Sequence, residues 1–102
     1  MTRMKTIYHI TSADAAEEAG KSGEYVPDRF AEEGFIHCSY SHQIQGVLDR
    51  IFKGRTDLVI LEIDPALLHC RVVDENLEGG TELFPHVYGR LPMSAVLSIR
   101  GL

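Results

Sequence analysis

The sequence predicts an α+β domain in which short strands form antiparallel or mixed β-sheets accompanied by two main helices. Short apolar segments rich in β-branched and aromatic residues recur along the chain, and one segment near its middle repeats its apolar residues with a helical period. With 102 residues, 44% hydrophobic and 25% charged, the chain has the composition of a soluble globular domain. We therefore expect residues 1–102 to form a single domain.

The first part of the chain predicts a strand followed by a helix. The segment "KTIYHIT" is rich in strand-forming residues, and Ser12 or Asp14 then offers an N-cap for a helix over "ADAAEEAG". Glu17 follows Asp14 at the spacing of a capping box. The next segment, "KSGEYVPDRF", contains Gly23 and Pro27 and has no steady hydrophobic period, so we expect a loop there.

A second strand and the clearest helix follow. In "GFIHCS" the side chains alternate, so that Phe35, His37 and Ser39 are expected on one face of a strand. The segment 44–52 then predicts an amphipathic helix, and Gly54 is a stop signal after it. Its apolar residues fall at helical spacing: Ile44, Val47, Leu48, Ile51 and Phe52.

The last part of the chain predicts three more strands. The segment "DLVILEID" is short and almost entirely apolar, which is typical of a central strand, and Pro65 ends it. The segments "CRVVDE" and "SAVLSIR" predict two further strands. Between them, "ENLEGGTELFPHVYGRLP" is expected to be a connection with a short edge strand around Phe84, because Pro85 lacks the N–H that a central strand needs.

The sequence favours a cytoplasmic protein for which a nucleic-acid partner is not expected. The formal net charge is −5, so the chain lacks the basic surface that non-specific binding to a phosphate backbone requires. We see no signal-peptide segment and no membrane-spanning segment. Cys38 and Cys70 are the only cysteines, and we expect both to be reduced. The oligomeric state is left open.

Three of the five histidines lie in similar local sequences and predict a shared site. His9 precedes Thr11 by two residues in "YHIT", and His37 precedes Ser39 in the same way, so each strand presents an imidazole and a hydroxyl on one face. These groups are suited to a polyhydroxylated ligand. We expect His86, in "FPHVYG", to join His9 and His37 across the same pocket. In the alternative interpretation each ring bonds the backbone at a sheet end.

Further polar residues are candidates for the same pocket. Glu82 and Glu75 could stabilise positive charge that develops on a sugar carbon, although either could be a solvated loop acid. Tyr88 could stack on a flat ring, and Arg90 could contact a phosphate. The spacing of the three histidines matches no local metal motif, so no metal is expected, but a metal-dependent hydrolase is kept as an alternative.

The chain resembles the small bacterial proteins of domain-of-unknown-function family 952. The resemblance rests on four segments that come in the same order and span essentially the whole chain: "YHIT", "EGFIHCS" followed by Gln43, "LVILEID", and "FPHVYG" followed by "LP" and "AV". Members of the family often have a tryptophan in the first helix, and this chain has none. The difference leaves open how that helix packs or what it contacts.

A more distant resemblance links "YHIT", "FIHCS" and "LVILEID" to ADP-ribosyltransferase-like proteins, in particular the NAD-dependent RNA 2′-phosphotransferases. It implies an ADP-ribosyltransferase-like fold of two small sheets around a cleft that binds NAD or a related nucleotide. By this resemblance His9 and Thr11 hold the nicotinamide-ribose end, His37 takes the second position of the site, and Glu82 or His86 takes the third.

The activity implied is cleavage of the nicotinamide–ribose bond with transfer to an unidentified acceptor. The chain lacks the arginines that those phosphotransferases use against RNA phosphate, so RNA is not an expected substrate. Catalytic roles therefore fall on His37, Glu82 and His86, and ligand-binding roles on His9, Thr11, Ser39, Tyr88 and Arg90. The alternative is a non-catalytic module that binds a small ligand on the same fold.

Overall fold

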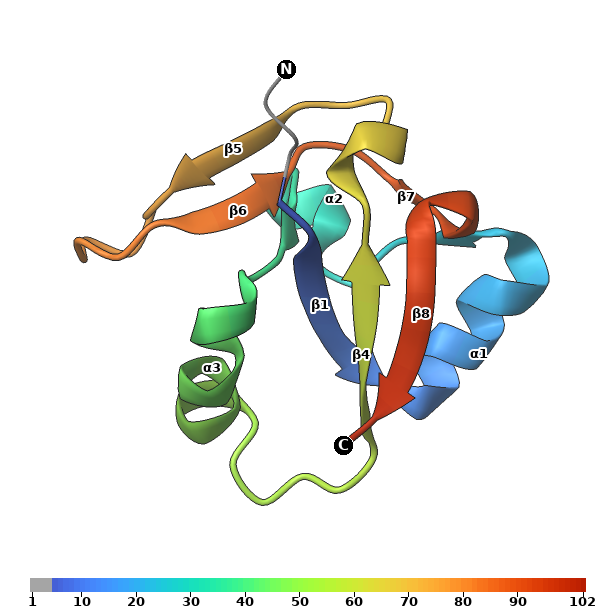
Figure 1. Ribbon diagram of the computed structural model, residues 1–102, viewed down its shortest axis with the longest axis horizontal. Coiled ribbons are helices and arrows are strands. Elements are labelled where there is room, and N and C mark those ends of the chain that lie inside the picture. Colours follow the sequence, from blue (N-terminus) through green and yellow to red (C-terminus); the bar gives the residue numbers. More distant parts are fainter. Residues whose placement is uncertain (1–4) are drawn as a thin grey trace.

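The centre of the fold is a three-stranded antiparallel sheet. A computed structural model describes residues 5–102, so residues 1–4 of the single domain expected over 1–102 lie outside it. Strand β4 (Leu58–Ile63) lies between β1 (Ile7–Ser12) and β8 (Val96–Gly101), which confirms that "LVILEI" is a central strand (Figure 1). His9 pairs with Leu61 in the register of β1 and β4.

Two helices lie beside this sheet, where capping signals predicted the first and hydrophobic periodicity predicted the second. Helix α1 (Ala13–Ser22) begins directly after β1, and the Ser12 side chain caps it by accepting a hydrogen bond from the Ala15 amide. Ala16 and Ala19 of α1 belong to the main core together with Ile7, Leu61 and Ile63, which are all buried. Helix α3 (Ile44–Ile51) lies near β1, away from α1 (Figure 1), and a short 3₁₀ helix, η1 (Ser41–Gln43), precedes it.

A second three-stranded sheet has the order β3–β6–β5, from β3 (Ile36–His37), β6 (Phe84–Val87) and β5 (Val72–Glu75). The expectation of an edge strand around Phe84 is wrong, because β6 is the middle strand and Pro85 is fully buried in it. The Pro85 carbonyl still accepts a hydrogen bond from the Cys38 amide. Proline has no N–H to return this bond, so the pairing of β3 with β6 ends at His37.

The segment expected to be a loop contains two short elements. It forms β2 (Glu24–Tyr25), which pairs with β7 (Leu91–Pro92), and it runs into the single-turn helix α2 (Phe30–Glu33). Elements this short span too few residues to give a period in the sequence. Two further 3₁₀ helices, η2 (Pro65–Leu67) and η3 (Met93–Ala95), complete the described elements.

The fold is thus α+β with antiparallel strand pairs, as expected from the sequence. The two larger sheets are joined where Tyr8 of β1 pairs with Ser39, just after β3, through two backbone hydrogen bonds of 2.7 and 2.8 Å. Both cysteines are free, and burial raises the pKa of the Cys38 thiol. Within residues 5–102 the structure has no helix with the length and apolar character needed to cross a membrane.

Candidate functional site

A cavity of about 610 Å³ lies between helix α3, residues 8–10 of β1, the end of β3 and the β5–β6 hairpin. Ligand sites commonly have volumes of about 300–1,000 Å³. His9, His37 and His86 all line this cavity, as do Ser39, Glu75 and Glu82. The structure therefore brings together the three histidines that the sequence analysis selected, although they make different contacts.

His86 is held by a carboxylate from the neighbouring strand. Its Nδ1 lies 2.9 Å from Oε2 of Glu75, and the side chain of His86 is only 5% exposed. The Tyr88 hydroxyl donates a second hydrogen bond to the same carboxylate oxygen. These bonds, first from Tyr88 and then from His86, lower the pKa of Glu75, so this carboxyl group is ionised at neutral pH.

The second ring nitrogen of His86 is accessible from the cavity. No group among the described residues bonds Nε2, yet this part of the chain has no buried side-chain nitrogen or oxygen atom without a hydrogen-bond partner. Nε2 must therefore be reached by solvent, through the cavity that His86 lines. Since the ionised Glu75 accepts from Nδ1–H in the neutral ring, Nε2 offers its lone pair to the cavity.

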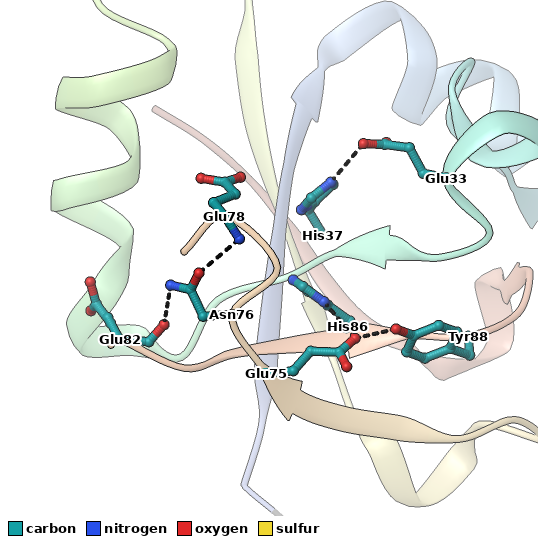
Figure 2. A network of polar contacts seen from close by, with 8 residues as sticks. All are labelled: Glu33, His37, Glu75, Asn76, Glu78, Glu82, His86 and Tyr88. Atoms are coloured by element: carbon teal, nitrogen blue, oxygen red, sulfur yellow. Dashed lines mark hydrogen bonds and ion pairs between the residues drawn. The ribbon is translucent and has the colours of Figure 1, made fainter. Parts of the chain in front are cut away.

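His37 lies beside His86 with a similar arrangement. Its Nε2 is 3.1 Å from Oε2 of Glu33, and the side chain is 48% exposed. The two imidazole centroids are 5.2 Å apart, and the Phe35 ring contacts both, with its centroid 4.3 Å from that of His86 and 4.7 Å from that of His37. Figure 2 shows the remaining nitrogen of each ring on the side where Asn76 and Glu78 lie.

His9 differs from the other two, because both of its ring nitrogens are bonded within the protein. Nδ1 lies 2.6 Å from the backbone oxygen of His37, and Nε2 lies 2.8 Å from the Tyr25 hydroxyl. Burial lowers the pKa of His9 to about 4, so the ring is neutral at pH 7. The His37 oxygen can only accept, so Nδ1 carries the proton and Nε2 accepts from Tyr25.

Thr11 completes the same internal network. Its hydroxyl lies 3.0 Å from that of Tyr25, and because Tyr25 gives its proton to His9, Thr11 is the donor in this contact. Thr11 is buried and does not line the cavity. The structure thus places His9 and Thr11 on one side of β1, as their spacing predicts, but it joins both to Tyr25 instead of leaving them free for a ligand.

The other predicted residues are divided between the cavity and the surface. Ser39 is buried and lines the cavity wall. Glu82 also lines it, and its carboxylate accepts a hydrogen bond of 3.2 Å from the Gln43 side chain. Tyr88 reaches the site through Glu75. Arg90 lies on the surface, outside the lining of the cavity, and pairs with Glu24 at 3.1 Å.

Several lining residues were not selected from the sequence. Glu33 comes four residues before His37 but from a different element, α2, which gave no period in the sequence. Arg29, Arg50 and Glu78 also line the cavity. The sequence feature that could have indicated Glu33 is its position at the start of the "EGFIHCS" segment, which also contains His37.

Negative charge predominates along the cavity. The imidazoles of His37 and His86 each contact a carboxylate through one ring nitrogen. Two arginines face four carboxylates in the lining: Arg29 and Arg50 against Glu33, Glu75, Glu78 and Glu82. An imidazole that is oriented by a carboxylate and has its other nitrogen open can act as a general base or acid.

In the described part of the chain, no three or more His, Cys, Asp or Glu side chains are grouped as a metal site requires.

The comparisons with known proteins point to one family. A family model described as "Protein of unknown function (DUF952)" matches residues 10–99. The crystal structure of protein CC0527 from Caulobacter crescentus is similar at 30% identity with a TM-score of 0.84, over 96% of this chain and 86% of that chain. The solution NMR structure of CC0527 is similar at 31% identity with a TM-score of 0.83, over 97% of this chain and 85% of that chain. No curated protein matches the chain.

Proposed function

The chain belongs to the family of proteins of unknown function designated DUF952, and for this member we propose that the cavity binds the nicotinamide-ribose end of NAD or of a related ADP-ribose-type nucleotide. The observation that carries the proposal is the pair of carboxylate-held imidazoles, His37 and His86, which open on one cavity. An ADP-ribosyltransferase-like arrangement of the two larger sheets around this cavity is part of the same proposal.

The charge of the cavity supports the nicotinamide end of the nucleotide as the bound group. The nicotinamide ring of NAD carries a positive charge, and Glu33 and Glu75 lie in the lining next to the two imidazoles. Opposite charges attract most strongly where water is largely excluded, and Glu75 is only 22% exposed. A phosphate placed at the same point would be repelled.

The same groups support cleavage of the bond between nicotinamide and ribose. His86 would take a proton from a water molecule or an acceptor hydroxyl through Nε2, and that oxygen would bond to C1′ of the ribose. The C1′–N bond breaks, and its electron pair leaves with nicotinamide, which departs as a neutral molecule. The carboxylates, with Glu82 as the further candidate, stabilise the positive charge that develops on the ribose, and His86 then releases its proton to solvent.

Titration with NAD and with nicotinamide mononucleotide tests binding, and chromatography of released nicotinamide tests catalysis. We expect His86→Ala to weaken binding by about 1–3 kcal/mol, the usual cost of losing a buried polar contact. Glu82→Gln should retain binding and lower nicotinamide release. The matched control is His69→Ala, because His69 is an exposed histidine outside the cavity lining. Equal binding by the wild type and His86→Ala would contradict the proposal.

A non-catalytic ligand-binding module is the second candidate. It is favoured by the hydrogen bonds of the Gln43 amide, which donates to both the Glu82 carboxylate and the Leu83 backbone oxygen and so gives Glu82 a structural contact. The two candidates differ in one measurement. Saturable binding of NAD without any release of nicotinamide above the spontaneous rate would favour the binding module.

A further inference from the structure

Arg50 lines the cavity and, within residues 5–102, forms no ion pair. It lies in the last turn of α3, and its side chain is exposed to the solvent that enters the cavity. Arg29, the other arginine of the lining, differs in this respect, because its guanidinium lies 3.6 Å from the Glu32 carboxylate. The positive charge of Arg50 therefore faces the cavity without a directly bonded carboxylate from the described chain.

Two contacts orient the Arg50 side chain. Its Nε donates to the Gly46 backbone oxygen at 3.3 Å, and its guanidinium carbon lies 5.7 Å from the centroid of the Phe84 ring. Neither contact uses the two Nη amino groups, and no described residue accepts a hydrogen bond from them. The protein thus holds the guanidinium in place while its Nη–H groups stay available to a ligand.

Arg50 and the two imidazoles belong to different sides of the cavity. Figure 2 shows the pale green helix α3 and the side chains of His37 and His86 on opposite sides of Asn76. The imidazoles are accompanied by carboxylates, which favour a cation, whereas the guanidinium favours an anion. A ligand that reaches both sides therefore fits best if it has a positive charge at one end and a negative charge at the other.

The lining also contains Glu78 and Glu82, whose negative charge opposes an anion in the cavity. The Glu82 carboxylate accepts a hydrogen bond from the side chain of Gln43, which precedes the first turn of α3, whereas Arg50 lies in the last turn. Neither carboxylate is paired with Arg50 in the structure. An anion can therefore bind Arg50 without breaking an existing ion pair, although the two carboxylates reduce its affinity.

We propose that Arg50 binds a phosphate group of the ligand and so selects a phosphorylated nucleotide over the corresponding nucleoside. The N–H groups of a guanidinium form a planar fork that matches two oxygens of a phosphate. The inference rests on the proposed function for the rest of the ligand, whose nicotinamide ring lies beside His37 and His86. Arg50 then has the phosphate-binding role expected for Arg90, which does not line the cavity.

The test is NMR titration of the ¹⁵N-labelled full chain with three probes in separate experiments. The probes are nicotinamide mononucleotide, nicotinamide riboside, which lacks the phosphate, and ribose 5-phosphate, which lacks the nicotinamide. We expect the wild type to bind the mononucleotide about tenfold more tightly than the riboside, as one charge-assisted contact allows. Both phosphorylated probes should shift the Nε–H signal of Arg50. The preference for the mononucleotide should shrink in about 0.5 M NaCl, because salt screens an exposed charge pair.

Two arginine variants provide the matched comparison. Arg50→Gln should bind the mononucleotide and the riboside equally, with the affinity for the riboside unchanged, and it should fold because the side chain is exposed. Arg55→Gln is the control and should keep the full preference. The Arg55 guanidinium also lies 5.7 Å from an aromatic centroid, that of Phe52, but it pairs with Asp57 and does not line the cavity.

The outcomes separate this inference from the proposed function. Equal binding of the mononucleotide and the riboside by the wild type, or a preference that persists in Arg50→Gln, would overturn the role of Arg50 and leave the proposed function standing. Binding of ribose 5-phosphate that Arg50→Gln weakens, without any binding of nicotinamide riboside, would support the phosphate contact and contradict the proposed function. No binding of any probe would overturn both.

Discussion

The His86 imidazole and the Glu75 carboxylate meet diagonally across two neighbouring strands. His86 of β6 pairs in register with Val73 of β5, and Glu75 follows Val73 by two residues, so its side chain lies on the same face. The resulting distance between Nδ1 and Oε2 is 2.9 Å. The register of the hairpin therefore fixes the ring orientation, and with it the nitrogen that faces the cavity.

This geometry predicts the tautomer of His86. In the wild type at neutral pH we expect the neutral ring to be protonated at Nδ1 and unprotonated at Nε2, because the ionised Glu75 can only accept. Imidazole ¹⁵N chemical shifts distinguish the two tautomers. In Glu75→Gln the amide can also donate to Nδ1, so the Nε2–H tautomer should become populated.

The same substitution should lower nicotinamide release by about 10–100-fold, because a base in the wrong tautomer cannot take a proton through Nε2. Glu17→Gln is the control, since Glu17 is an exposed carboxylate on α1. An unchanged tautomer in Glu75→Gln, or the Nε2–H form in the wild type, would mean that Glu75 does not set the orientation of this ring.

The sequence predicted the larger elements because their hydrophobic periods are long enough to detect. Segment 44–52 and "LVILEI" gave correct predictions of α3 and of the central strand β4. The position of β6 was predicted wrongly, because Pro85 was taken to exclude a middle strand. A proline fits there because β3 pairs with β6 only through Ile36 and His37. Pro85 lies one residue beyond these pairs, so β3 needs no hydrogen bond from an N–H at this position.

The candidate site was predictable only in part. The side-chain alternation correctly placed His9 and Thr11 on one face of β1, but their partner Tyr25 comes from β2, and nothing local in the sequence indicates this contact. Glu33 was missed for a similar reason, because it reaches His37 from α2. Long-range contacts of single side chains depend on how the elements pack, which periodicity does not report.

Gln43 should stabilise both the fold and the loop that borders the cavity. It is buried, its Oε1 accepts from the Tyr40 amide at 2.9 Å, and its Nε2 donates to the Leu83 backbone oxygen at 2.8 Å. Gln43→Ala leaves these groups without partners, so we expect a loss of about 2–3 kcal/mol in the free energy of unfolding. Urea denaturation measures this loss.

Hydrogen exchange of the amides in residues 76–83 should also become faster in Gln43→Ala, because the loop loses a contact with η1. Gln45→Ala is the control substitution. The Gln45 side chain is exposed, and among the described residues it hydrogen-bonds only to the Asp49 carboxylate. Gln45→Ala should change the stability by less than about 0.5 kcal/mol. Equal effects of Gln43→Ala and Gln45→Ala on the free energy of unfolding would show that the hydrogen bonds of Gln43 do not stabilise the fold.

Gly89 should tolerate no side chain, because Cys70 packs directly against it. A Cβ atom at Gly89 would lie 2.7 Å from Cβ and 2.9 Å from Sγ of Cys70. We expect Gly89→Ala to lower the free energy of unfolding by about 1–3 kcal/mol, as overpacking does in other cores. Thermal denaturation of the purified variant measures the change.

Second substitutions identify the clashing atom. In a Cys70→Gly background, Gly89→Ala should cost less free energy of unfolding than it costs in the wild type, because the Cβ atom of residue 70 is absent. In a Cys70→Ala background the cost should not be relieved in this way, because alanine retains Cβ. Gly20→Ala is the control: Gly20 lies in α1, and a methyl group added there would have no neighbouring atom within 4 Å, so the substitution should be neutral or stabilising by up to about 1 kcal/mol. A neutral Gly89→Ala would refute the close contact.

His9 should make the stability depend on pH between about 4 and 6.5. Burial lowers the pKa of His9 to about 4, whereas the unfolded chain has the ordinary value of 6.5. In this window the unfolded state binds more protons, so stability rises with pH. The contribution is fully present above pH 6.5 and is lost as the pH falls toward 4, because a charged ring cannot accept the Tyr25 hydrogen bond.

Urea denaturation at about pH 7.5 and about pH 5 tests this dependence. At about 1.4 kcal/mol per pH unit, lowering the pH from about 6.5 to about 5 should cost the wild type about 2 kcal/mol from His9 alone. His9→Gln should be less stable at about pH 7.5 but should lose about 2 kcal/mol less on acidification, since glutamine does not titrate. The lowered pKa of Glu75 acts mainly below its usual value of 4.5, so it contributes little to this interval. If both proteins lost the same stability between the two pH values, His9 would not be the buried neutral histidine that its contacts with His37 and Tyr25 require.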